Sequence, residues 1–431
     1  MKARKLLLKT KTFDELGILP GVIKVLQSKE IHKPTDIQLM AMPWLLKNIS
    51  HSLVSAQTGT GKTLTYTLPL FQILRSQYPI PNPPPEKHSP RAIIIVPNRD
   101  LSRQCEGVLN QFQHETGLKT FSSFTGQKLN IECSELEKGV DILIATPERI
   151  DNHIKNKTLN FSKLTNMIID ESDTLIDAGL TRHLDSYYQE LHKTVKFSFV
   201  SATFPLPLQN FILERFSYNE NDEKPYIKKI IDEKAHLNLT NLKHEFVELK
   251  EHDKKPVFEK VLDDVCKDIG DGGCMIFCNN IPIAYNVEKM LIDKGLKAVS
   301  LHGDVNPKRR TANIQAFVNK EAKFMVCTDL ASRGLDFPFV SYVLQYDFPI
   351  TEGDYVHRAG RTGRAGRPGT VITLYRKENI PTVLQFKRSF EKNEPLRMQS
   401  SAFSMKNKLH HITSKQTSQE KLKNILHKIK E

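Results

Sequence analysis

Residues 52–63 read Ser-Leu-Val-Ser-Ala-Gln-Thr-Gly-Thr-Gly-Lys-Thr, a short apolar run followed by a glycine-rich string. The run predicts a buried strand, and the string has the residues that a loop needs to wrap a polyphosphate. Gly59 and Gly61 permit backbone conformations that point successive N–H groups at one anion. Lys62 adds positive charge near the β- and γ-phosphates, and the Thr63 hydroxyl can reach Mg²⁺. A helix expected to begin here would turn its positive end toward the phosphates. The alternative is a glycine-rich turn with a solvated lysine.

The bulk composition indicates a folded, basic protein of more than one domain. A chain of 431 residues exceeds one typical core, so two or three domains are expected. Apolar residues make up 39% and charged residues 26%. No run of about 18 uncharged apolar residues occurs, so we expect no membrane span. The formal net charge of +13 favours a polyanionic partner over the alternative of a generally basic surface.

The six cysteines show neither a Cys-x-x-Cys pair nor the spacing of a zinc site. Several lie within strand-like runs, such as Cys274-Met-Ile-Phe-Cys278. We therefore expect reduced core thiols in an intracellular protein.

Apolar β-rich runs alternate with polar turns and helical stretches along the chain, which predicts parallel sheets with helices on both faces. The predicted strands are 53–56, 92–96, 142–145, 167–169 and 197–200, then 274–278, 298–301, 324–327, 342–346 and 370–374. Polar strings follow these runs, at the edge of a parallel sheet where ligands gather. Shifts in composition divide the chain into a basic N-terminal segment (1–12), a first domain (13–230), a linker (231–241), a second domain (242–397) and a basic C-terminal tail (398–431).

An acidic string, Asp170-Glu-Ser-Asp173, closes one of the predicted strands. Adjacent carboxylates at a strand end suit a Mg²⁺–nucleotide site. Asp170 would hold the ion directly or through water, and Glu171 would position and deprotonate an attacking water. Alone the string could be a solvated turn; its separation from the phosphate loop favours the catalytic interpretation.

Together these strings resemble the motifs of the DEAD-box family of ATP-dependent RNA helicases, within superfamily 2, in the family's order over about residues 13 to 375. The matching strings are Phe13 with Lys33-Pro-Thr-Asp-Ile-Gln38 (Q motif), residues 56–63 (motif I), Pro97-Asn-Arg-Asp-Leu101 (Ia), Thr146-Pro-Glu-Arg149 (Ib), Asp170-Glu-Ser-Asp173 (II), Ser201-Ala-Thr203 (III), Ile276-Phe-Cys-Asn279 (IV), Thr328-Asp-Leu-Ala-Ser-Arg-Gly-Leu-Asp336 (V) and His357-Arg-Ala-Gly-Arg-Thr-Gly-Arg364 (VI). The resemblance implies two tandem RecA-like domains, each a mostly parallel sheet with helices on both faces.

The resemblance also assigns roles to residues of this chain. ATP would be contacted by Phe13, Gln38 (which would read the adenine edge), Gln57, Thr58, Gly59, Thr60, Gly61, Lys62, Thr63, Gly334 and Asp336. Catalysis would rest on Lys62, Asp170, Glu171, His357, Arg361 and Arg364, with Thr63 and Asp170 at Mg²⁺. RNA would be held by Arg99, Thr146, Arg149, Arg310 and Thr328. Asp173, Ser201 and Thr203 would couple the domains to each other.

Arg361 and Arg364 are three residues apart, so they would share one face of a helix or turn. Placed opposite the phosphate loop, they would neutralise charge on the γ-phosphate oxygens in the transition state, an effect worth about 10³–10⁵ in rate. They belong to the second domain, so catalysis would require the domains to close, and His357 would link closure to the hydroxyls of motif III.

Several positions depart from the family pattern. Ser172 replaces an alanine, and Asp36 and Glu30 replace a proline and a glycine of the Q motif. Phe124-Thr-Gly126 stands where a Gly-Gly pair normally contacts RNA, and Pro307 replaces a glutamine near Arg310. These changes place RNA contacts in question but remove no catalytic group.

The sequence thus predicts an RNA-dependent ATPase that separates strands locally. Phosphate contacts would position one strand without reading its sequence, and 2′-hydroxyl contacts would select RNA. One alternative is an ATP-gated RNA clamp or assembly platform, in which hydrolysis only resets binding. A weaker alternative is a DNA translocase, which predicts equal stimulation by single-stranded DNA.

The biological setting is predicted from weaker signals. The first 11 residues carry five basic side chains and no acid, as a mitochondrial transit peptide, an RNA-facing arm or a solvated end would. Thr174-Leu-Ile-Asp177 and Ala202-Thr-Phe-Pro205 resemble the mitochondrial ribosome-assembly members of the family. We expect a monomer in the mitochondrial matrix that acts on large-subunit ribosomal RNA with a protein activator or ribosome assembly factors. The alternatives are the nucleus or nucleolus and the cytoplasm.

Overall fold

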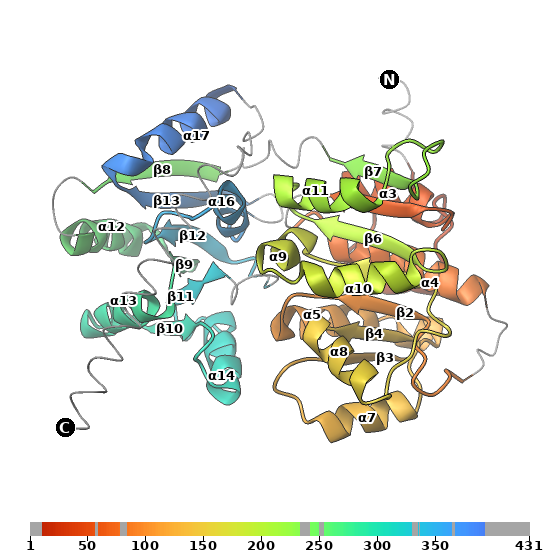
Figure 1. The fold of residues 1–431 in the computed structure, drawn as a ribbon. Helices are drawn as coiled ribbons and strands as arrows, with labels where there is room; N and C mark the ends of the chain where they lie inside the picture. The colour runs from red at the N-terminus through yellow and green to blue at the C-terminus, as the bar shows by residue number, and fades with distance from the viewer. Residues whose placement is uncertain are drawn as a thin grey trace, which may run out of the picture.

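The computed structural model describes residues 11–56, 59–77, 84–232, 242–249, 254–329, 335, 337–363 and 367–392. These residues form two α/β units, each built on one sheet (Figure 1). Every strand pair in both sheets is parallel, as the alternating pattern predicts. The predicted fold class is therefore confirmed. No helix in the described ranges is both long and apolar enough to cross a membrane.

The first sheet has seven strands in the order β3-β4-β2-β5-β6-β1-β7. They are β1 (His51–Ser55), β2 (Ala92–Ile95), β3 (Thr120–Ser123), β4 (Ile142–Ala145), β5 (Asn166–Ile169), β6 (Lys196–Ser201) and β7 (Ile227–Ile231). Its helices are α2 (Pro20–Ser28), α3 (Asp36–Leu45), α4 (Lys62–Ser76), α5 (Arg99–Asn110), α6 (Gln113–Thr116), α7 (Leu129–Glu137), α8 (Pro147–Lys155), α9 (Ser172–Asp177), α10 (Thr181–Leu191) and α11 (Leu206–Arg215).

The second sheet has six strands in the order β10-β11-β9-β12-β13-β8. They are β8 (Leu242–Glu248), β9 (Gly273–Cys278), β10 (Ala298–Leu301), β11 (Phe324–Thr328), β12 (Val340–Gln345) and β13 (Gly369–Tyr375). Its helices are α12 (Lys254–Asp268), α13 (Ile281–Asp293), α14 (Pro307–Val318), α16 (Glu352–Ala359), the 3-10 turn η3 (Lys377–Asn379) and α17 (Ile380–Lys392).

Each sheet is buried on both faces, because successive residues of its central strands point into different cores. Ile94 packs with α3 and α4 on one face, whereas Ile93 and Ile95 pack with α10 and α11 on the other. In the second sheet, Phe277 belongs to the core on one face and Ile276 belongs to the core on the other. Burial on both faces explains why these strands are continuous apolar runs in the sequence.

Three strands escape sequence-based prediction: β3, β7 and β8. All three lie at sheet edges. An edge strand is partly solvated and carries polar residues, so its apolar signal is weak. The Leu-Lys-His-Glu-Phe-Val-Glu sequence of β8 illustrates this. Four cysteines are buried as predicted, namely Cys105, Cys274, Cys278 and Cys327.

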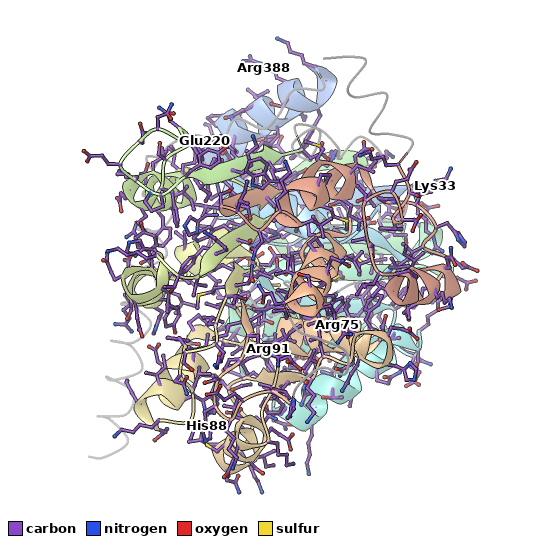
Figure 2. All side chains as sticks on the ribbon, turned by 90° about the vertical axis from the view of Figure 1, so that its right-hand side faces the viewer. Lys33, Arg75, His88, Arg91, Glu220 and Arg388 are labelled. Carbon is purple, nitrogen blue, oxygen red and sulfur yellow. The ribbon has the colours of Figure 1, made fainter. Side chains whose placement is uncertain are left out.

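Two buried polar side chains of the first domain, Arg91 and His51, have specific partners. Arg91 is buried and forms an ion pair with Asp141 at 2.7 Å, whereas Lys33 and Glu220 lie exposed at the periphery (Figure 2). His51, at the start of β1, is 4% exposed and accepts a hydrogen bond at Nδ1 from the Phe197 N–H at 3.0 Å. Burial, with smaller contributions from Lys196 and His192, lowers the pKa of His51 to about 4.

This pKa predicts a loss of stability in mild acid. Between about pH 6.5 and pH 4 the unfolded chain binds a proton at His51 that the folded chain does not, so the unfolding free energy falls as the pH falls. The contribution reaches about 1.4 kcal/mol per pH unit. Urea unfolding at several pH values measures it. His51→Asn retains an acceptor near Nδ1 without titrating, so its stability should depend less steeply on pH; equal slopes for both proteins would contradict the assignment.

Candidate active site and nucleic-acid groove

The phosphate loop has the predicted backbone. Gly59 and Gly61 have φ values of 79° and 82°, in the left-handed region, and α4 begins at Lys62 directly after the loop. Gln57 and Thr58 lie outside the described residues. The Lys62 ammonium is buried and donates to the Ala56 carbonyl at 2.9 Å, while Thr63 is half-buried beside it. A polyphosphate entering the loop must therefore draw Lys62 away from Ala56.

The acidic pair lies at the carboxyl end of β5 and is buried. Asp170 accepts from the Tyr66 hydroxyl at 2.8 Å and from the Glu171 N–H at 2.9 Å. Burial and the charge of Glu171 raise the pKa of Asp170 to about 6, against the opposing effects of Lys62 and Tyr66. Glu171 has a φ of 48°, and its Oε2 is buried with no hydrogen-bond partner within the described part of the chain. An uncompensated carboxylate oxygen of this kind suits a base that awaits its water.

The oxygen donors at this edge also fit Mg²⁺, which prefers such ligands. Thr63 and Asp170 are the residues that would hold it beside the phosphates. A second cluster, Glu171, Asp173 and His357, has its donor atoms within 4.8 Å of one another. Two members of that cluster are hydrogen-bonded to each other, which favours a structural role for it.

The residues near the N-terminus that are predicted to contact ATP have different environments. Gln38 accepts from the Thr35 N–H at 2.9 Å and donates to the Gly61 carbonyl at 3.2 Å, so it lies against the phosphate loop. Thr60 is also tied to this segment, because its carbonyl accepts from the Thr35 hydroxyl at 2.8 Å. Phe13 is 2% exposed and packs in the core with Ile37, and its contact with a nucleotide stays a prediction. It supports the site through packing.

Asp173 joins three predicted elements at one carboxylate oxygen. Its Oδ2 accepts from the Thr203 N–H at 3.1 Å, from the Thr203 hydroxyl, and from His357 Nε2 at 3.0 Å. Ser201 supports Thr203 by donating to its carbonyl at 2.5 Å. Because His357 belongs to α16 of the second domain, this cluster is a direct contact between the domains.

The arginines of the second domain have distinct environments. Arg361 is buried and donates to the carbonyls of His357 and Leu335, at 3.2 and 2.5 Å. Arg364, Gly334 and Asp336 lie outside the described residues. Sequence reasoning overlooked Arg358, which is fully buried and donates to both oxygens of Asp329 at 2.6 and 2.7 Å.

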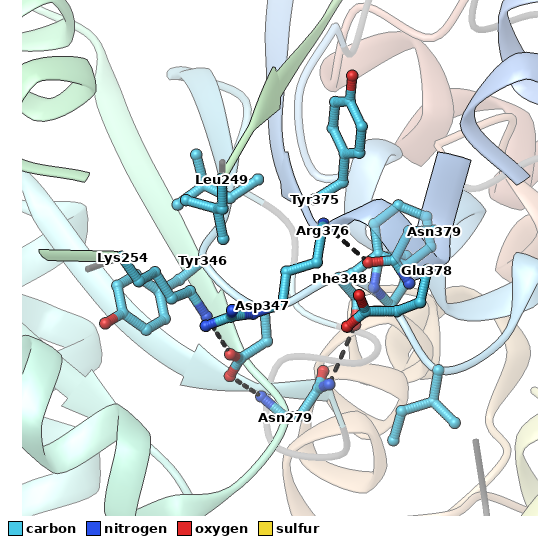
Figure 3. A pocket seen from close by; sticks show the side chains of 13 residues that line it. Leu249, Lys254, Asn279, Tyr346, Asp347, Phe348, Tyr375, Arg376, Glu378 and Asn379 are labelled. Carbon is cyan, nitrogen blue, oxygen red and sulfur yellow. Dashed lines mark hydrogen bonds and ion pairs between the residues drawn. The ribbon is translucent and has the colours of Figure 1, made fainter. Parts of the chain in front are cut away.

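Arg358 also organises the carboxyl ends of β9 and β12. It donates to Asn279 Oδ1 at 2.6 Å and to the Asp347 carbonyl at 2.7 Å. Figure 3 shows the outer end of this network, where Asp347 links Lys254 to the Asn279 backbone and Asn279 reaches the Phe348 carbonyl. The cavity of about 250 Å³ drawn there is bordered by these polar contacts. Motif VI contains several arginines. The sequence alone does not show which of them is buried in a structural network and which would face a phosphate.

A cavity of about 820 Å³ runs between the domains, and we call it the RNA groove. Its lining includes Arg99, Thr146, Arg310 and Thr328, four of the five residues predicted to hold RNA. The Thr146 hydroxyl is buried and has no hydrogen-bond partner among the described residues, as a phosphate ligand would be before binding.

Two of the arginines that are predicted to contact RNA form bonds with other protein groups in this structure. Arg310 lines the groove, but its guanidinium is paired with Asp100 across the domain boundary at 2.6 Å. It therefore helps to hold the domains together and is not a free phosphate ligand in this state. Arg149 lies beside the groove; it donates to the Gln127 carbonyl at 2.7 Å and approaches Glu132 at 3.7 Å.

Comparison with known proteins identifies the family. Residues 35–211 match the DEAD/DEAH box helicase family and residues 257–366 the helicase conserved C-terminal domain. The Helicobacter pylori DEAD-box ATP-dependent RNA helicase RhpA is 30% identical over 380 residues, which cover 88% of this chain and 73% of RhpA. The chain belongs to the DEAD-box family of ATP-dependent RNA helicases.

Two other relatives of this DEAD-box protein are also named as ATP-dependent RNA helicases. The human probable ATP-dependent RNA helicase DDX28 is 31% identical over 391 residues, covering 84% of this chain and 70% of DDX28. The Arabidopsis thaliana DEAD-box ATP-dependent RNA helicase 39 is 29% identical over 405 residues. The match covers 92% of this chain but 63% of the longer plant protein.

Solved structures share the fold. The Saccharomyces cerevisiae Dbp5 structure bound to RNA and ADP BeF3 has a TM-score of 0.73 at 24% identity and covers 94% of this chain and 99% of that one. Mss116 bound to ssRNA and UDP-BeF has a TM-score of 0.76 at 23% identity, covering 90% and 80%.

The contact of Asp173 with His357 predicts a specific defect in a DEAD-box ATPase. Asp173→Asn weakens an acceptor that serves both domains, so RNA-stimulated ATP hydrolysis should fall about 10- to 100-fold, the range expected for hydrogen bonds to a charged group. Binding of a fluorescent ATP analogue should change less than about twofold, because Asp173 does not line the phosphate loop. The matched control is Asp185→Asn on α10, which removes a carboxylate that accepts from Arg215 of α11. Wild-type turnover in Asp173→Asn would show that the contact is not used.

Proposed function

We propose that this protein hydrolyses ATP when ATP and RNA together draw its two domains shut, and that the shut state separates RNA base pairs locally. The observation that carries the proposal is the Asp173–His357 contact. It ties the acidic string beside the phosphate loop to α16, the helix that ends two residues before Arg361, and it lies between the same domains that line the RNA groove. Closing on ATP and closing on RNA are therefore one movement.

The chemical step follows from the groups on either side of the phosphate loop. Glu171 takes a proton from a water that attacks the γ-phosphorus, the bond from that phosphorus to the bridging oxygen of ADP breaks, and ADP and phosphate leave. Lys62, released from Ala56, compensates charge on the β- and γ-phosphates from the first domain. Arg361 and Arg364 compensate it from the second. Mg²⁺, held through Thr63 and Asp170, would add further positive charge there.

RNA takes part because the groove needs residues from both domains. Arg99 and Thr146 hold the strand from the first domain and Thr328 from the second, through contacts to its backbone. A strand that follows both walls must bend where they meet, and a bent strand loses pairing nearby. The solved Dbp5 and Mss116 structures, which contain RNA with a nucleotide analogue, support this arrangement for the shared fold.

An ATP-gated clamp remains the alternative, since the same contacts would grip RNA without separating it. Glu171→Gln tests both. Loss of the base should lower RNA-stimulated ATP hydrolysis about 10²- to 10⁴-fold while ATP-dependent RNA binding persists. Glu190→Gln, on the exposed face of α10, is the matched control. If the wild-type protein binds RNA tightly with ATP but neither turns over nor separates a short duplex, the clamp is correct; equal stimulation by single-stranded DNA would favour a DNA translocase.

For the biological setting we propose mitochondria and large-subunit ribosomal RNA, with a protein partner that promotes closure. The supports are the basic N-terminal segment and the strings 174–177 and 202–205; one solved Dbp5 structure is bound to Gle1. Imaging the full-length protein with a C-terminal tag should place it in mitochondria. Signal confined to the nucleolus or cytoplasm would refute this setting and leave the enzymatic proposal intact.

A further inference from the structure

A second cavity opens beside the RNA groove on the second domain. It has a volume of about 560 Å³, within the range of about 300–1,000 Å³ typical of small-molecule sites. We call it the side recess. It lies between α13 and the segment that joins β10 to α14, elements that are neighbours in Figure 1. Four residues border both cavities: Ile281, Asp304, Val305 and Asn306. The recess is therefore continuous with the path of the RNA strand.

Two largely buried polar groups line the recess. His302 is 6% exposed, and its Nδ1 has no hydrogen-bond partner within the described ranges. Glu288 is also 6% exposed, and among the described residues it forms an ion pair with the exposed Arg309 at 3.9 Å. An ionised carboxylate only accepts hydrogen bonds, and a buried imidazole nitrogen without a partner is costly. Both groups therefore favour a polar ligand that turns a hydrogen-bond donor toward Glu288.

One edge of the recess is aromatic. Tyr285 lies on α13, one turn before Glu288, and its side chain is 61% exposed. An exposed ring beside an RNA path offers a surface on which a base can stack, and such stacking is sequence-tolerant. Asp304 adds a second carboxylate at the border with the groove.

We propose that the side recess takes one RNA base that carries an amino group, turned out of the strand whose backbone occupies the RNA groove. Tyr285 stacks on the base, and Glu288 accepts from its amino group. His302 Nδ1 completes the hydrogen bonds. Guanine, adenine and cytosine present an amino donor. Uracil offers only its N3–H, which lies between two carbonyl oxygens that a carboxylate repels, so the recess disfavours uracil. Burial lowers the pKa of His302, against the effects of Glu288 and Asp304, so the imidazole brings no competing charge.

This inference rests on the proposed function, because it requires RNA in the groove. It adds a sequence preference to a protein whose groove contacts read only the backbone. The carboxylates also favour a base over RNA backbone in the recess, because Glu288 and Asp304 repel phosphates.

The test measures fluorescence anisotropy of ten-nucleotide RNAs bound to the full-length protein with a non-hydrolysable ATP analogue. The reference is an all-uracil strand, and the others carry one guanine, adenine or cytosine, moved through each position. One position should bind about five- to tenfold tighter with an amino-bearing base, the size expected for one stacked and paired base. Glu288→Gln should reduce the preference, whereas Asp293→Asn, which removes a charge from the exposed end of the same helix, should preserve it.

A second measurement reports occupancy directly. 2-Aminopurine at the preferred position should lose fluorescence on binding, because stacking quenches it. Tyr285→Ala should restore the fluorescence and weaken binding about tenfold, while Tyr285→Phe keeps both effects. Equal affinity for all strands at all positions, or equal effects of Glu288→Gln and Asp293→Asn, would overturn the proposal that the side recess binds a base. Failure of the all-uracil strand to bind or to stimulate ATP hydrolysis would instead overturn the proposed function.

Discussion

The Oδ2 atom of Asp173 is the point on which the arrangement of the two domains depends. It accepts from Thr203 within the first domain and from His357 in the second. Asp173 lies in α9, three residues after Asp170, and Arg361 donates to the carbonyl of His357, so a movement of the second domain that breaks this contact also moves Arg361 away from the acidic string. A buried carboxylate with several donors is well satisfied only when all of them are present. In the proposed function, this contact couples the closed state at the ATP site to the closed state of the RNA groove.

The RNA groove is lined by acidic as well as basic side chains. Arg310, which a sequence reader would assign to RNA, is paired with Asp100, and Asp304 and Glu148 lie on the same walls. The net positive charge of the chain is thus not concentrated in the described groove. The proposed backbone recognition therefore uses neutral donors such as the Thr146 hydroxyl together with Arg99. This balance favours a strand that binds when the domains are shut and leaves when they open.

Much of the site could be predicted because its chemistry is local. The phosphate loop, the acidic pair and the polar strings at strand ends each need fixed residue types at fixed spacings, and the structure places them at one sheet edge. The sequence does not show the environment of each residue. Phe13 is buried in the core, Arg310 has a carboxylate partner from the other domain, and Arg358 joins three strand ends. Tyr66, which donates to Asp170, carries no motif signal, because only folding brings α4 and β5 together.

The sequence by itself determined the parallel α/β fold, the order of the motifs and the family, since apolar runs and glycine spacing act over short stretches of chain. The edge strands β3, β7 and β8 escaped prediction because solvent on one side permits polar residues, whereas the edge strand β10 was predicted. Only the tertiary structure decided which charges are compensated and which polar atoms are left without partners. Those properties depend on residues far apart in the chain, such as Asp100 with Arg310 and Asp173 with His357, and on the exclusion of water between them.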